Sequence, residues 1–138
     1  MKHFVVINSA KNFEDTCFDL NTAVEAHHFG LLAIHDLAAT LRSKNIQFSE
    51  NCRVFEVCNP QQAALVLETD MSLCMALPCR ISVFTEAGQT KIAMIRPADL
   101  FRDLSDTPAL IKVALEVEST MMDMINEASS PASKCSTC

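Results

Sequence analysis

Cys52-Arg53-Val54-Phe55-Glu56-Val57-Cys58, followed at once by Asn59-Pro60, is the stretch that decides how this chain folds. These seven residues have the length and the β-branched and aromatic side chains of a strand. Asn59 offers a side-chain amide that can cap a helix, and Pro60 suits the first helical position. The stretch therefore predicts a strand that leads directly into a helix, which runs to about residue 68.

The chain before this stretch alternates between the same two element types. Residues 3–8 form a short β-branched run typical of a strand. From Asn12 onward, apolar side chains recur at helical spacing, and Gly30 suits the end of this helix. Residues 31–35 then predict a second strand, and Asp36 can cap a shorter helix that reaches about residue 44.

The chain after the stretch contains a hairpin and one more helix. Residues 70–78 read as irregular or as a single turn. Residues 79–85 and 90–95 have strand composition and are joined through Glu86-Ala87-Gly88-Gln89, which predicts a β-hairpin. Pro108 opens a last helix, whose apolar stripe continues to about residue 125.

The order β-α-β-α-β-α-β-β-α predicts an α+β fold. We expect a two-layer domain with a mixed or antiparallel β-sheet covered by α-helices. A length of 138 residues fits one domain, which we place at residues 1–128. Residues 129–138 are small and polar, and we expect them to form a flexible C-terminal tail.

The composition excludes several classes of function. Gly30 and Gly88 are the two glycines of the chain, so it lacks the P-loop and dinucleotide motifs, and we expect no nucleotide cofactor. With 17 acidic and 11 basic residues, no Trp or Tyr and no run of Lys or Arg, we expect no nucleic-acid partner. No apolar stretch approaches the roughly 18 residues of a membrane span, and no secretory signal is evident. The expected location is the cytoplasm, with no membrane partner.

The residues most suited to bind a metal ion or to react lie at three junctions between predicted elements. Cys58 directly precedes a proline-opened helix, whose N–H groups favour a thiolate, so we expect its pKa to fall. Cys79 begins a strand, and His35 ends one. If these junctions meet at one edge of the sheet, then Cys58, Cys79 and His35 form a site for zinc, another soft metal ion or a small reactive sulfur species.

Two alternatives use the same residues differently. In a thiol, sulfur-transfer or redox enzyme, Cys58 would be the catalytic nucleophile and His35 its base. In an interaction protein there would be no site, and the Met-rich last helix would lie in the core or between two copies of a homodimer. In the metal site and in the enzyme site alike, Glu56 and Asn59 are candidates for contacts to the residues that bind or react. The tail pair Cys135-x-x-Cys138 could deliver a metal, resolve an oxidised Cys58 or have no defined role.

The elements Glu56-Val57-Cys58-Asn59-Pro60 and Leu77-Pro78-Cys79-Arg80-Ile81-Ser82-Val83-Phe84 resemble those of the domain of unknown function 302 family. The resemblance extends from about residue 18 to residue 97. It implies a small cytosolic TBP-like α+β domain that is often dimeric, with no assigned reaction and with a zinc ion in some members. We therefore expect a homodimer with a thiol and imidazole site.

Overall fold

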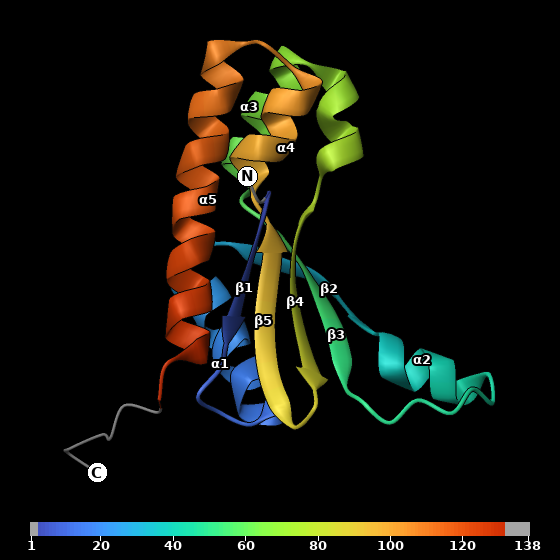
Figure 1. Cartoon of the computed structure of the whole chain (residues 1–138). Helices are drawn as coiled ribbons and strands as arrows, with labels where there is room; N and C mark the ends of the chain where they lie inside the picture. The colour runs from blue at the N-terminus through green and yellow to red at the C-terminus, as the bar shows by residue number, and fades with distance from the viewer. Residues whose placement is uncertain (1–2, 132–138) are drawn as a thin grey trace.

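A computed structural model describes residues 3–131 of the chain. Its five strands form one antiparallel sheet in the order β1-β5-β4-β3-β2 (Figure 1). The strands are β1 (Phe4–Asn8), β2 (Gly30–Asp36), β3 (Cys52–Cys58), β4 (Cys79–Glu86) and β5 (Gln89–Ile95). The predicted α+β class is confirmed, and the sheet is antiparallel throughout.

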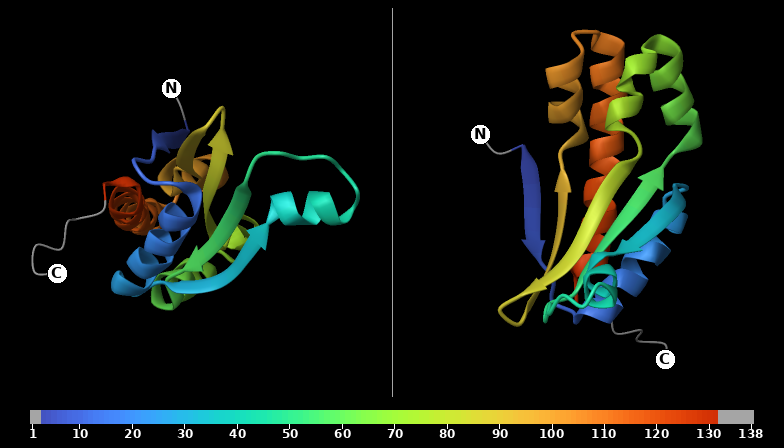
Figure 2. Two further views of the ribbon diagram at one scale, coloured as in Figure 1. Left: turned by 90° about the horizontal axis from the view of Figure 1, so that it is seen from below. Right: turned by 90° about the vertical axis from the view of Figure 1, so that its right-hand side faces the viewer.

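All of the helices except α2, which projects from the edge of the sheet at β2, cover one face or one end of this sheet (Figures 1 and 2). They are α1 (Phe13–Ala26), α2 (Leu37–Ser43), α3 (Pro60–Thr69), the 3-10 helix η1 (Met71–Ala76), α4 (Pro97–Leu104) and α5 (Pro108–Ser129). α1 and α5 pack against each other on one face, while α3, η1 and α4 gather around the first half of α5 beyond one end of the sheet (Figures 1 and 2). No helix within residues 3–131 is long and apolar enough to span a membrane.

Alternation along the strands separates a covered face from an open one. The covered face of the three inner strands carries six buried apolar side chains: Phe55, Val57, Ile81, Val83, Ile92 and Met94. Against them lie Met121, Met124 and Ile125 of α5, each fully buried. These methionines therefore fill the core and do not form a surface for a second copy.

Strands β4 and β5 separate after the hairpin. Beyond the two-residue turn they pair only as far as Ser82 and Ala93. From there β4 continues beside β3 as far as Cys79, while β5 continues beside β1 as far as Ile95. The sheet thus divides into two prongs, and we call residues 79–82 of β4 together with residues 93–95 of β5 the sheet fork.

Helix α4 is missing from the predicted order, which places no element between the hairpin and the last helix. Arg96 stands at its N-cap and makes no side-chain capping bond. The carboxylate of Glu118, on α5, instead accepts a hydrogen bond from the Ala98 N–H at 3.1 Å. Pro97 in the first turn is a local signal for this helix, but the group that caps it comes from another helix.

Two predicted boundaries need correction. α1 ends before Gly30, because His28 takes the left-handed conformation with φ 64° and Gly30 already belongs to β2. α5 includes Ser129, whose carbonyl accepts a hydrogen bond from the Ala10 N–H at 2.8 Å, so this residue belongs to the helix and not to a tail. The predicted tail residues from 132 onward, with Cys135 and Cys138, lie outside the described residues.

Phe55 and Val54 test the assignment of the two faces. Phe55 is 1% exposed on the covered face, whereas the neighbouring Val54 is half-buried on the open face. Phe55→Ala should lower the free energy of unfolding by about 3–5 kcal/mol because it leaves a cavity, and Val54→Ala by about 1 kcal/mol. Urea denaturation measures both. Similar losses for the two variants would contradict this assignment.

Candidate functional site

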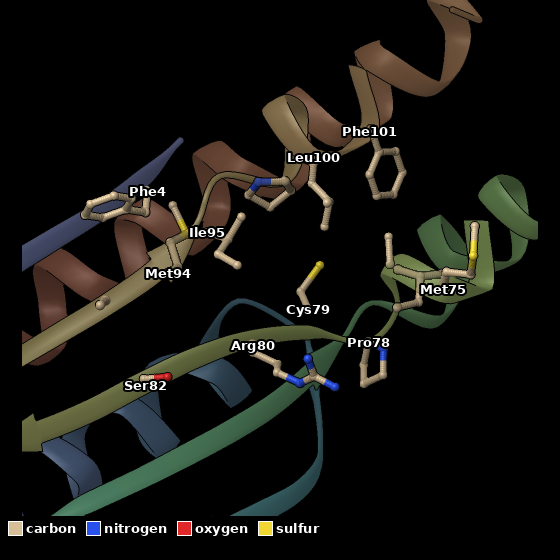
Figure 3. Close-up of a pocket in the computed structure, with 14 residues that line it drawn as sticks. Phe4, Met75, Pro78, Cys79, Arg80, Ser82, Met94, Ile95, Leu100 and Phe101 are labelled. Atoms are coloured by element: carbon tan, nitrogen blue, oxygen red, sulfur yellow. The ribbon is translucent and has the colours of Figure 1, made fainter. Parts of the chain in front are cut away.

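A cavity of about 290 Å³ lies in the sheet fork (Figure 3). Both prongs of the sheet line it, and α4 and η1 complete its walls. Pro78, whose peptide bond with Leu77 is cis, leads from η1 into β4, and Pro97 leads from β5 into α4. Lining side chains include Met75, Leu77, Cys79, Arg80, Ser82, Ile95, Leu100 and Phe101.

Arg80 is the one charged residue among the described residues that line this cavity. Its side chain is largely exposed, and its Nε donates to Glu56 Oε2 at 3.4 Å. His35 Nε2 lies 3.1 Å from the other oxygen of Glu56. The contact with His35 and the hydrogen bond from Arg80 hold the pKa of Glu56 below its usual range. An ionised Glu56 therefore keeps Arg80 at the edge of the cavity.

Cys79 presents its sulfur to the interior of the cavity. The sulfur points into the space between β4 and β5, toward Leu100 (Figure 3). Burial raises the pKa of this thiol to about 11, and the nearby Cys58 adds to the rise. The Cys79 side chain is therefore a neutral thiol at pH 7.

Cys58 lines a second, narrow hollow together with Cys79, among apolar side chains such as Val66 and Val113. Burial raises the pKa of its thiol, so the predicted fall is wrong. Cys58 lies two residues before Pro60, the first residue of α3, and the Asn59 side chain already accepts the Gln62 N–H at 3.1 Å. Asn59 thus satisfies one N–H of the helix N-terminus, and burial sets the direction of the pKa shift at Cys58.

The structure brings Cys58 and Cys79 together but not His35. Because β2 and β3 are antiparallel, Cys58 lies opposite Gly30, and His35 lies opposite Val54. Five residues of β2 separate these two positions, which corresponds to about 16 Å. His35 is exposed and faces Glu56, so the expected convergence of three junctions is wrong. A thiol enzyme built on Cys58 would lack its predicted base.

A closed zinc site does not fit the described residues. Structural zinc takes four ligands, usually sulfur and nitrogen atoms. Cys58 and Cys79 supply two, Asn59 caps α3, and Glu56 is engaged by His35 and Arg80. Within residues 3–131, no group of three His, Cys, Asp or Glu side chains is arranged to hold a metal ion.

Most of the residues that form the cavity are not marked in the sequence as site residues. Met75 and Leu100 carried no motif, Arg80 stood in the Leu77–Phe84 element without a predicted role, and α4 was not predicted at all. The available signals were Pro78 and Pro97, which mark where each strand meets its helix. They do not indicate that two paired strands separate at that point, because separation depends on which neighbour each strand retains.

Two comparisons with known proteins match most of the chain, including the sheet fork. The family model described as "Domain of unknown function DUF302" matches residues 5–128. The crystal structure of an uncharacterized conserved protein DUF302 from Bacillus stearothermophilus is similar with a TM-score of 0.87 and 28% identity, over 93% of this chain and 99% of that chain. No curated protein matches the chain significantly.

Thiol reactivity tests the electrostatics of this region. A rise in pKa from 9.0 to about 11 lowers the thiolate fraction of Cys79 roughly 100-fold. At pH 7, among the cysteines of residues 3–131, iodoacetamide should modify the exposed Cys74 first, with Cys58 and Cys79 far slower. Peptide mapping by mass spectrometry follows each position over time. Modification of Cys58 or Cys79 as fast as that of Cys74 would contradict the neutral-thiol assignment.

Proposed function

We propose that this chain, which belongs to the DUF302 family, is a binding module for a small ligand with an apolar body and an anionic group. The ligand binds in the cavity of the sheet fork. The observation that carries this proposal is a cavity of about 290 Å³ with mainly apolar walls and one charged side chain, Arg80. Cavities close to 300 Å³ with few polar groups are typical of small-molecule sites.

Arg80 recognises the anionic group. A guanidinium presents a planar set of N–H donors that matches a carboxylate. Arg80 Nε donates to Glu56 at 3.4 Å, a long contact that a ligand carboxylate can replace or complement. The Ser82 hydroxyl, on the same prong of the fork, offers a further donor to the ligand.

The interior of the cavity favours the apolar body. Ile95, Leu100 and Phe101 offer hydrocarbon surface, and the neutral Cys79 thiol behaves as a small apolar group. A thiol with a pKa of about 11 is a poor nucleophile at pH 7. The chemistry of the cavity therefore supports binding rather than attack on the ligand.

Octanoate and octan-1-ol test the two halves of this recognition. They share the apolar body and differ in the charged end. Arg80→Gln should weaken octanoate binding roughly fivefold and leave octan-1-ol binding unchanged, because it removes a charge-assisted hydrogen bond. Isothermal titration calorimetry measures both. Arg102→Gln is the matched control, since Arg102 lies on α4, is exposed and does not line the cavity.

A second variant separates the cavity from the charge. Ala93 lines the base of the fork, so Ala93→Phe should fill the cavity and abolish binding of both compounds, with circular dichroism confirming that the variant folds. Failure of both compounds to bind the unmodified protein would contradict the proposal. An equal effect of Arg80→Gln and Arg102→Gln would contradict the role of Arg80.

A soft metal ion or a reactive sulfur species is the second candidate ligand. The observation that favours it is that Cys58 and Cys79 line one hollow and that charge on Cys58 raises the pKa of Cys79. Two sulfurs without a third ligand suit a soft monovalent ion such as Cu(I) better than zinc.

Competition with a Cu(I) chelator tests this candidate. The tail pair offers competing thiols, so the titration should use the Cys135→Ser, Cys138→Ser background. In that background, Cys58→Ser and Cys79→Ser should each lose the bound ion, while Cys52→Ser, at the far end of β3, should retain it. Loss of all Cu(I) binding in the background itself would assign the ion to the tail and contradict a site at Cys58 and Cys79.

A further inference from the structure

Four apolar side chains of β1 and β5 are neighbours on the open face of the sheet. Phe4 pairs with Ile95, and Val6 pairs with Ala93. Val5 packs against the core, so alternation along β1 places Phe4 and Val6 on the open face. We call Phe4, Val6, Ala93 and Ile95 the apolar strip.

The apolar strip leaves much of its hydrocarbon surface in water. Phe4, Val6 and Ile95 are 48%, 46% and 60% exposed. α1 and α5 pack on the opposite face of the sheet and leave the strip open (Figure 2). A hydrocarbon chain that covers this surface removes apolar area from water, which favours its binding.

The apolar strip is continuous with the cavity of the sheet fork. Phe4, Ala93 and Ile95 line the cavity, whereas Val6 does not. Phe4 and Ile95 lie on one side of the cavity, and Arg80 lies on the other (Figure 3). A chain whose anionic end is held by Arg80 therefore crosses the fork before it reaches the strip.

Polar side chains mark the far end of the apolar strip. Asn8 and Lys91 form the next pair on this face beyond Val6. The Lys91 Nζ lies 3.0 Å from Glu86 Oε1, so an ion pair borders the strip there. The open face thus favours hydrocarbon between the cavity and Val6 and a polar group or solvent beyond it.

We infer that the ligand of the sheet fork is a long-chain aliphatic carboxylate whose distal carbons leave the cavity and lie on the apolar strip against Val6. This inference rests on the proposed function and names the class of its ligand. Arg80 binds the carboxylate, the interior of the fork holds the first part of the chain, and the strip covers the remainder. A ligand that ends inside the cavity would leave Val6 untouched.

Octanoate and dodecanoate test this inference because they share the carboxylate and differ in chain length. A fully buried methylene group tightens binding about fourfold, so the four additional methylene groups, about half covered on an open strip, should tighten dodecanoate binding roughly 15-fold. Val6→Asn should weaken dodecanoate binding roughly fivefold and leave octanoate binding unchanged, since Val6 lies outside the cavity. Isothermal titration calorimetry measures both acids.

Ile34→Asn is the matched control for Val6→Asn. Ile34 is 47% exposed, against 46% for Val6, and lies on β2 at the opposite edge of the sheet. This variant should bind both acids like the unmodified protein. Circular dichroism checks that both variants fold.

A second measurement needs no variant. In a protein labelled with ¹³C at the valine methyl groups, dodecanoate should shift the Val6 signals in a saturable manner, and octanoate should not. Equal affinities for the two acids, or an equal effect of Val6→Asn on both, would overturn the inference and leave the proposed function standing. Absence of binding by both acids would contradict the proposed function itself.

Discussion

The separation of β4 and β5 is the constraint on which the rest of the structure depends. Each strand retains its outer neighbour, so β4 stays with β3 as far as Cys79 and β5 stays with β1 as far as Ile95. The space between them opens next to η1, which precedes β4 in the chain, and α4, which follows β5. A continuous β4–β5 pairing would close this space and remove the cavity.

The same geometry sets the chemistry of the side chains at the fork. Cys79 faces the enclosed interior, where burial keeps its thiol neutral, while Arg80 alternates to the open face and meets Glu56 of the next strand. A neutral apolar interior with a cation at its edge suits a ligand with the same two parts. These features support the proposed ligand site rather than the alternative of a thiol-based active site.

Local signals predicted the elements, and non-local contacts decided the site. Asn59-Pro60 and Asp36 act on their own backbone neighbours, so the sequence correctly located α3 and α2. The cap of α4 comes from Glu118 on α5, and this helix was missed. His35 was expected near Cys58 because both lie at the ends of strands, but antiparallel pairing of β2 with β3 puts those two ends at opposite ends of the sheet. Strand order and register, which the sequence does not specify locally, decide which cysteines and charges meet.

Methionine methyl resonances give the most direct test of a ligand cavity in the fork. Met75 and Met94 line it from η1 and β5, whereas Met71, at the start of η1, does not. In a protein labelled with ¹³C at the methionine methyl groups, octanoate should shift the signals of Met75 and Met94 in a saturable manner and leave Met71 unchanged. Saturation without movement of Met75 and Met94 would contradict the account.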